Sequence, residues 1–273
     1  MNLQNIFNEI EKTDPEIYER LDDRRSVMHR FKNLGGKLAL TAIPVALGGM
    51  LSKAYGQTPP SDIIAILNFA LTLEYLESGF YNTAVGTSGL IDVSEMASFA
   101  DIQDDENAHV AFLSTTITSL GGTPVAKPEF DFTAGGAFAD VFSNYQTFLA
   151  VSQTFEDTGV RAYKGQAGGL ISNNGVLTAA LQIHSVEARH ASHVRRVRRL
   201  TGADSSEKPW ITGNSTNGIG SAVQASYNGE DNTMQLGIDI STLPGINAAI
   251  ATESFDEPLD MQAVLDIVGP FIK

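Results

Sequence analysis

The stretch Glu106-Asn-Ala-His109 falls in a helical pattern of apolar residues, and Glu187-Ala-Arg-His190 takes the corresponding place 81 residues later. Residues three apart on a helix share one face, so each motif can present a carboxylate and an imidazole side by side. Both motifs lie on the apolar stripe of their helix. A carboxylate that faces a core is costly unless it is paired, protonated or bound to a metal. These two stretches decide the fold and point to the site.

A second pair of positions repeats with nearly the same separation. Glu74 is followed by Tyr81, and Glu156 is followed by Tyr163, 82 residues further along. The chain therefore repeats one helical hairpin, and each copy supplies two glutamates, a histidine and a tyrosine. The period of the apolar residues predicts four helices, at about 61–85, 94–121, 137–166 and 175–201.

The predicted fold is all-α, a four-helix bundle over residues 57–203. Its two hairpins are joined by a long crossover at 122–136, where proline and glycine occur. Apolar residues make up 42% of the 273 residues, enough for a sizeable core without covalent cross-links.

The chain continues past the bundle as an irregular extension, residues 204–273. Glycine, asparagine, serine and threonine are frequent there, and 212–220 reads as a loop. We expect a strand at about 233–240 and a short apolar helix at 261–272, which would dock on the bundle or on another subunit.

Composition excludes several classes of function. The chain has no cysteine, which rules out thiolate zinc sites, iron–sulfur clusters and a built-in rubredoxin-type iron. The formal net charge of −14 argues against nucleic acid as a partner and suits small cations. No apolar run suggests a stable membrane span.

The donor set suits a pair of metal ions, since carboxylates and imidazoles from four helices form the di-metal sites of bundle proteins. Such ligands favour iron or manganese, with zinc as a further occupant. Two ions ~3.5–4 Å apart can share the electrons that reduce O2 or H2O2. The same side chains could also pair with one another in a bundle without metal. The candidate ligands are Glu74, Glu106, His109, Glu156, Glu187 and His190.

The motif set resembles the ferritin-like di-iron carboxylate superfamily, the group of ferritins, bacterioferritins and rubrerythrins, over residues 61–203. More narrowly, Leu67-Asn-Phe-Ala-Leu-Thr-Leu-Glu-Tyr-Leu-Glu77 and Phe255-Asp-Glu-Pro-Leu259 are similar to phrases in exported ferritin-like proteins related to plant desiccation-associated proteins.

The resemblance implies a role for each matched ligand. Glu106 and Glu187 would bridge two iron ions. His109 and His190 would each bind one ion through an imidazole nitrogen.

The resemblance also assigns the outer residues of the site. Glu74 and Glu156 would be the terminal carboxylates, and Tyr81 and Tyr163 would hydrogen-bond the ligands. Asp105 would orient a histidine across the site, and the alternative is a solvated surface carboxylate. The second motif has valine in the matching place, so this support would be one-sided.

Glu77 shares the stripe with Glu74, and the third helix offers only Gly159 at the matching position. We consider three roles for Glu77: a mobile extra ligand, a proton carrier, or a carboxylate hydrogen-bonded to Tyr163. His184 and His193 flank the second motif. His184 lies one turn away and could support a ligand of the site, but both histidines are interpreted as exposed or hydrogen-bonded outside it.

Five arginines crowd the end of the fourth helix, where the helix dipole alone would explain cations. They are Arg189, Arg195, Arg196, Arg198 and Arg199.

The N-terminal segment, residues 1–56, carries Arg24-Arg25, a short apolar run from Leu38 to Leu51, and a small-residue exit. This order is similar to a twin-arginine export signal and predicts a periplasmic protein. The alternative is a cytoplasmic protein that keeps a basic helix and a buried helix in an N-terminal arm.

Two classes of function remain. The first is a di-iron oxidoreductase that oxidises Fe(II) and reduces O2 or H2O2. The second is a non-catalytic stress- or desiccation-associated bundle that is structural or only binds metal. A homo-oligomer is compatible with both, whereas the length of the extension disfavours a storage shell.

Overall fold

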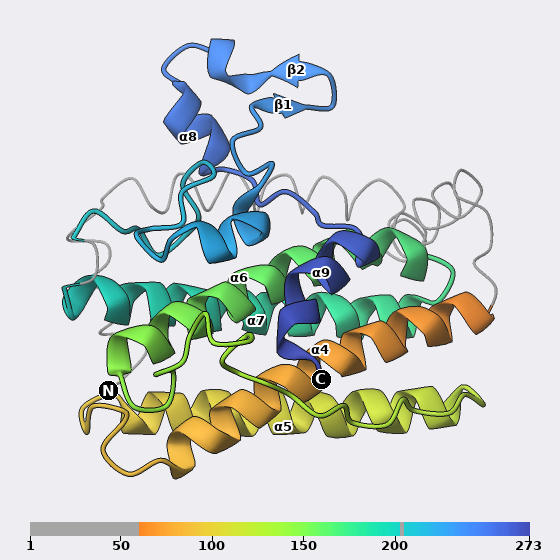
Figure 1. The fold of residues 1–273 in the computed structure, drawn as a ribbon. Coiled ribbons are helices and arrows are strands. Elements are labelled where there is room, and N and C mark those ends of the chain that lie inside the picture. Colours follow the sequence, from red (N-terminus) through yellow and green to blue (C-terminus); the bar gives the residue numbers. More distant parts are fainter. Residues whose placement is uncertain (1–59, 203–204) are drawn as a thin grey trace, which may run out of the picture. The chain divides into compact units, whose positions relative to one another are not determined.

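The computed structural model describes residues 60–202 and 205–273 (Figure 1). The export signal predicted within residues 1–56 lies outside this part. In residues 60–202, four long helices form two hairpins, in which α4 packs along α5 and α6 along α7. The predicted all-α four-helix bundle is confirmed. The helices are α4 (Pro60–Gly86), α5 (Met96–Ser119), α6 (Tyr145–Ala167) and α7 (Asn174–Leu200).

The third helix begins later than residue 137, where we predicted its start. Turns occupy residues 132–143 in place of the first part of the expected helix, and Gly135 and Gly136 within them have positive φ angles. Asn144 then caps α6, because its side chain accepts a hydrogen bond from the amide of Gln146 at 3.0 Å.

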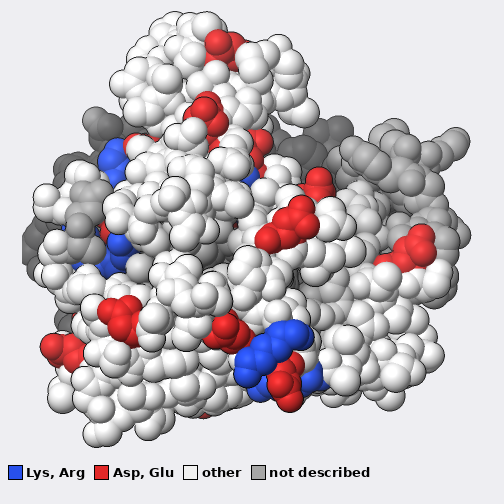
Figure 2. Space-filling model, in the orientation of Figure 1, with Lys and Arg blue, Asp and Glu red and all other residues white. Residues whose placement is uncertain are grey.

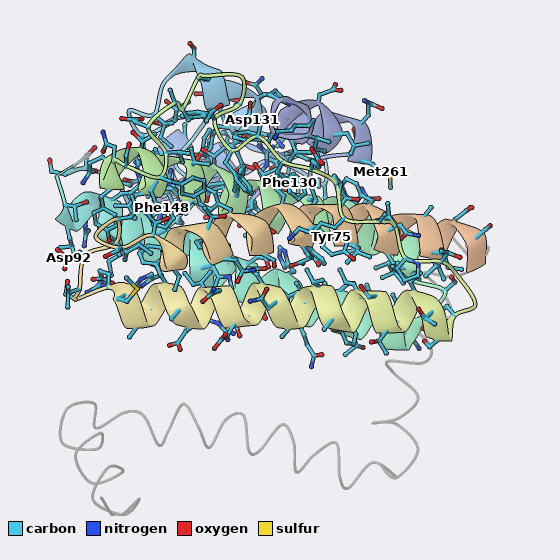
Figure 3. The ribbon with its side chains drawn as sticks, turned by 60° about the horizontal axis from the view of Figure 1, so that its bottom comes forward. Tyr75, Asp92, Phe130, Asp131, Phe148 and Met261 are labelled. Atoms are coloured by element: carbon cyan, nitrogen blue, oxygen red, sulfur yellow. The ribbon has the colours of Figure 1, made fainter. Side chains whose placement is uncertain are left out.

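One end of the bundle has a core of stacked rings, which we call the aromatic end: Phe80, Tyr81, Phe99, Phe148 and Phe155. Phe148 lies among them, with its ring centre 5.4 Å from that of Phe80 and 5.1 Å from that of Phe99. Figure 3 labels Phe148, which belongs to α6, and Tyr75, which belongs to α4.

The other end has a core of branched side chains, which we call the aliphatic end. Its buried members come from the four bundle helices and from η1 (Gly168–Leu170): Ile63, Leu67, Ala70, Leu71, Leu113, Ile117, Tyr163, Leu170, Val176, Ala180 and Ile183. Aliphatic side chains interlock without the directional contacts that rings make.

Helix α4 is the most apolar of the bundle helices. From Ser61 to Gly86 it is long and apolar enough to cross a bilayer, judged by length and composition. In the bundle, 67% of its most apolar window is buried, as expected of a core helix. It also carries the buried carboxylates of Glu74 and Glu77.

The crossover between the hairpins runs over α4 (Figure 3), and backbone hydrogen bonds join it to the C-terminal residues. A side chain at Gly79 would come within 3.3 Å of the Phe132 ring, so the glycine lets the crossover approach the helix. Asp131 donates its amide to the carbonyl of Phe271 at 2.8 Å, and Phe130 pairs with Ile272 in a β-bridge.

The extension contains short elements and little regular sheet. They are η2 (Ser221–Tyr227), β1 (Met234–Gln235), β2 (Ile238–Asp239), η3 (Ile240–Thr242), α8 (Ala248–Thr252), α9 (Met261–Val268) and η4 (Gly269–Phe271). The single strand expected at 233–240 is wrong. Leu236 and Gly237 both have positive φ and turn the chain, so the segment folds into an antiparallel hairpin.

The extension packs on the aromatic end. Helix α9, expected from the apolar pattern at 261–272, places Val264 and Val268 in that core, and Phe271 of η4 lies 4.8 Å from the Phe155 ring. The described members of the aliphatic cluster include no residue of the extension.

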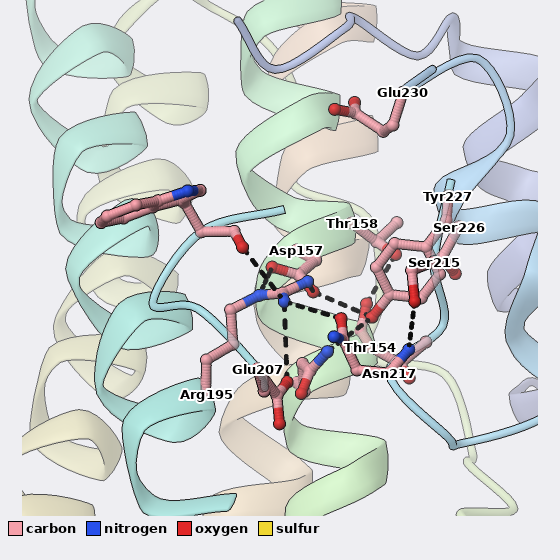
Figure 4. A network of polar contacts seen from close by, with 12 residues as sticks. Thr154, Asp157, Thr158, Arg195, Glu207, Ser215, Asn217, Ser226, Tyr227 and Glu230 are labelled. Atoms are coloured by element: carbon pink, nitrogen blue, oxygen red, sulfur yellow. Dashed lines mark hydrogen bonds and ion pairs between the residues drawn. The ribbon is translucent and has the colours of Figure 1, made fainter. Parts of the chain in front are cut away.

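Two of the arginines at the end of α7 are buried, so the helix dipole alone does not explain them. Arg195 donates to Asp157 of α6 at 3.0 Å and to the side chain of Asn217 at 3.0 Å (Figure 4). Arg198 lies 3.0 Å from a carboxylate oxygen of Glu207. These two arginines tie the extension to the bundle, whereas the remaining three are exposed.

Arg161 of α6 is a third buried anchor. Its guanidinium donates to the carbonyls of Glu257 at 2.7 Å and Asn228 at 2.9 Å. It also lies 2.7 Å from the carboxylate of Glu230. Most donors of this buried cation therefore point to the backbone of the extension, which satisfies them without water.

Candidate metal centre

The six candidate ligands meet in the middle of the bundle. The structure gathers them in two groups, each with donor atoms within 4.8 Å of one another. Glu106 and Glu187 belong to both groups. The first group is Glu74, Glu106, His109 and Glu187, and the second is Glu106, Glu156, Glu187 and His190.

The two oxygens of Glu106 face different histidines. Oε2 lies 3.1 Å from Nδ1 of His109, and Oε1 lies 2.8 Å from Nδ1 of His190. A carboxylate in this position can join two ions, with one oxygen on each. The helical spacing of three residues brings Glu106 and His109 to one face, and the packing of α7 brings His190 to the other side.

Each histidine is surrounded by carboxylates. Nδ1 of His109 lies 3.2 Å from Glu74 and 3.4 Å from Glu187. Nδ1 of His190 lies 3.4 Å from Glu156, while its Nε2 lies 3.1 Å from Asp105. Asp105 is half-exposed at the rim of the site, in the place where a carboxylate fixes the tautomer of a metal-bound histidine.

The two tyrosines cross between the hairpins. Tyr81 of α4 donates its hydroxyl to Glu156 of α6 at 2.5 Å, and Tyr163 of α6 donates to Glu74 of α4. Each hairpin therefore holds the outer carboxylate of the other. The sequence repeat returns as an approximate two-fold relation between the halves of the site.

Glu77 breaks this relation, since Gly159 stands at the matching place on α6. A Cβ atom at Gly159 would lie 2.7 Å from an oxygen of Glu187 and 3.2 Å from Glu77. The glycine thus makes room for two carboxylates. Of the roles considered for Glu77, the hydrogen bond to Tyr163 is not seen, because that hydroxyl binds Glu74.

The donor set fits a bound cation. Among the described residues, both oxygens of Glu187 and one of Glu77 are buried without a hydrogen-bond partner. Nδ1 of His190 and Oε1 of Glu106 also lack hydrogen-bond alignment although they are 2.8 Å apart. Unpaired buried acceptors that converge on one point are costly unless a cation satisfies them.

The pKa values of the buried glutamates reflect the same cost of burying unpaired carboxylates. Burial raises the pKa of Glu74 to about 8. Burial and the neighbouring carboxylates also raise the pKa of Glu187 and Glu77 well above the usual value of a glutamate. Burial also acts on Glu106, yet hydrogen bonds from both site histidines lower its pKa to about 2. A bound metal ion would favour the charged form of all these groups.

All four glutamate ligands are fully buried, so the acidic side chains scattered over the face in Figure 2 are other residues. The flanking histidines also lie outside the donor groups. Nδ1 of His184 lies 3.0 Å from the carbonyl of Val160, and His193 lies 3.3 Å from Glu95.

Comparison with known proteins adds the family. A family model described as a ferritin-like domain matches residues 62–199, just over half of the chain and nearly the whole bundle. No curated protein matches the sequence significantly.

Proposed function

Because the chain belongs to the ferritin-like domain family, we propose that it binds two Fe(II) ions as substrates and oxidises them with O2 or H2O2. The observation that carries the proposal is the central place of Glu106 and Glu187, which are shared by both donor groups. Manganese or zinc would fit the same ligands.

In this proposal, Glu106 and Glu187 bridge the two ions. Glu74 with His109 completes one position, and the equivalent pair from the second hairpin completes the other. Each Fe(II) gives up one electron. The oxidant takes up two electrons and two protons, so O2 becomes H2O2, or H2O2 becomes two molecules of water.

The other residues position these ligands. The hydroxyls of Tyr81 and Tyr163 fix the outer carboxylates. Asp105 accepts a hydrogen bond from Nε2–H of His190, which keeps Nδ1 of that ring unprotonated and free to bind a cation. Glu77 is a buried carboxylate beside Glu187 that has no counterpart on the second hairpin, and we assign it to proton transfer near the ions.

The alternative is a bundle that binds metal, or none, without turnover. It is favoured by the contacts of His109 and His190, whose pKa values the surrounding carboxylates raise. Two imidazolium groups would compensate part of the buried negative charge in the absence of metal. The two proposals therefore differ in whether Fe(II) is bound and changes oxidation state.

The test is iron content per chain after Fe(II) is added in air, with the Fe(III) formed followed by absorbance. We expect two irons per chain in the native protein and a loss of both in Glu106→Ala/Glu187→Ala. The control is Asp101→Ala/Asp104→Ala, which removes two exposed carboxylates from α5. No stoichiometric iron in a correctly folded native chain would contradict the proposal, and bound iron that stays Fe(II) would leave the non-catalytic alternative.

A further inference from the structure

A small cavity lies beside the candidate metal centre, lined mainly by the aliphatic end of the bundle and also by Phe69, Leu73 and Ala162 of the other core cluster. Its volume is about 20 Å³, and it is lined by side chains from all four bundle helices. Leu67, Leu73 and Leu113 are among its buried walls. Ala70 and Ala180 face it with short side chains, which leaves the space open.

The lining of the cavity includes residues near the surface and one residue that contacts a ligand of the site. Phe112, which is 43% exposed, lines its outer part together with the partly exposed Thr116 and Gln166. Tyr163 is another lining residue, and its hydroxyl donates a hydrogen bond to Glu74. A molecule in the cavity is therefore separated from a ligand of the site by one tyrosine side chain.

Size and polarity restrict the occupant. One water molecule needs a cavity of roughly 10–15 Å³, so this cavity suits a molecule of two or three atoms. Its walls are apolar apart from the outer Thr116 and Gln166, and the Tyr163 hydroxyl is already bound to Glu74. Water and H2O2 would lose hydrogen bonds on entering, whereas an apolar gas would not.

The matching tyrosine has different surroundings. Tyr81 packs against the rings of Phe80, Phe99 and Phe148, with centroid distances of 5.5, 6.3 and 6.3 Å. The approximate two-fold relation of the ligands thus does not extend to the space around them. The first donor group, with Glu74 and His109, is the one next to the cavity.

We propose that this cavity is a dioxygen site that supplies O2 to the Glu74–His109 side of the metal centre. The inference rests on the proposed Fe(II) oxidation and names O2 as the oxidant that the protein is shaped to use. In that reaction, two Fe(II) ions lose one electron each, and O2 gains both electrons with two protons and leaves as H2O2.

The binding step is tested on metal-free protein, by NMR of methyl groups under O2 pressure with N2 at equal pressure as the blank. Dissolved O2 is paramagnetic, so it speeds the relaxation of methyl protons near which it resides. We expect a severalfold larger effect at Leu67 and Leu113 than at Leu149 and Val151, which are equally buried in the aromatic end. Equal effects at both ends would overturn the proposal.

The functional step uses Ala180→Leu, which fills the cavity, and Ala179→Leu, which adds the same volume on the same helix outside the lining residues. In iron-loaded protein, Ala180→Leu is expected to slow oxidation by O2 severalfold and to leave oxidation by H2O2 within twofold. Ala70→Leu fills the same space from α4 and repeats the test if Ala180→Leu does not fold.

The outcomes separate this inference from the proposed function. Selective O2 relaxation together with a selective loss of the O2 rate supports the dioxygen site. An unchanged O2 rate in both filled variants overturns it. Absence of Fe(II) oxidation by either oxidant overturns the proposed function and the role of the cavity with it, whatever the relaxation data show.

Discussion

The two ends of the bundle differ in what completes their cores. The aromatic end combines stacked rings with the extension, whose α9 and η4 add Val264, Val268 and Phe271. The aliphatic end is closed by side chains of the bundle helices and η1, and it contains a cavity. The ligands between them follow the sequence repeat, while their surroundings do not.

This difference teaches that a repeated hairpin can keep a symmetric set of ligands in an asymmetric core. Ring packing and buried ion pairs make one side dense and fixed. Aliphatic packing with small residues such as Ala70 and Ala180 leaves space on the other. The predictions below test this division, beginning with the largest effect.

Removal of residues 260–273 should destabilise the protein most. It takes Val264, Val268 and Phe271 out of the aromatic end. At roughly 1.5–3 kcal/mol for each fully buried side chain, the loss is about 5 kcal/mol or more. Urea unfolding measures it, and Leu265→Ala, at a partly exposed position of α9, serves as the near-neutral control. A shortened chain with native stability would show that the bundle completes this core alone.

Phe148→Ala should cost more than Leu113→Ala. Phe148 touches four other rings, including Phe80 and Phe99, and its removal opens a space that the fixed neighbours cannot fill. We expect a loss of about 3–5 kcal/mol at Phe148 and about 2–3 kcal/mol at Leu113. Both values come from chemical denaturation, and a larger loss at Leu113 would contradict the division.

The free energy of unfolding should depend on pH through Glu230, a buried residue of the extension. Burial raises the pKa of Glu230 to about 7, against 4.5 for an ordinary glutamate. Between these pH values the folded chain keeps a proton that the unfolded chain has lost, so stability falls as pH rises from 4.5 to 7. Glu230→Gln should remove about 2 kcal/mol of this dependence.

The measurement is the free energy of unfolding at pH 5 and pH 8 for the native chain and Glu230→Gln. Contributions from the metal centre are common to both chains and cancel in the comparison. Glu253→Gln, in a pair with Lys208 near the surface, should keep the native slope. If the unfolding free energy of Glu230→Gln depends on pH as strongly as that of the native chain, Glu230 is not the cause of the dependence.

The smallest expected effect concerns the two crossing tyrosines. Tyr81→Phe and Tyr163→Phe each remove one hydrogen bond to an outer carboxylate, and we expect each to lower Fe(II) affinity about tenfold. If the halves act independently, the double variant loses about tenfold at each of the two positions, which is about a hundredfold in the product of the two binding constants. Anaerobic Fe(II) titration measures the three values. A full loss in one single variant would show that the ligands are less symmetric than their contacts.

The helices and the gathering of the ligands follow from local sequence patterns. The spacing of Glu106 and His109 fixes their common face, and its recurrence at Glu187 and His190 indicates a second half. The sequence pattern does not locate the start of α6, because Asn144 can be identified as its N-cap only when the turns before it are known. The strand expected at 233–240 is wrong because the chain turns at Leu236. The sequence alone gives no reason for the positive φ of this residue.

Other features depend on contacts between distant residues. Arg195 and Arg198 look like ordinary cations at a helix end, and their burial arises from Asn217 and Glu207 in the extension. The cavity likewise leaves no pattern, because it results from short side chains on separate helices. The sequence shows Gly159 at the position that matches Glu77. Only the structure shows that this glycine leaves space for the carboxylates of Glu77 and Glu187.

The burial of Arg161 also sets an order of events during synthesis. The four bundle helices leave the ribosome first, and the acceptors of Arg161 at Asn228 and Glu257 follow only later in the chain. Until then its charge remains in water, since burial without partners is unfavourable. The newly made bundle therefore holds an open flank that the last part of the chain closes, and a nascent protein stalled before residue 257 stays unfinished on that side.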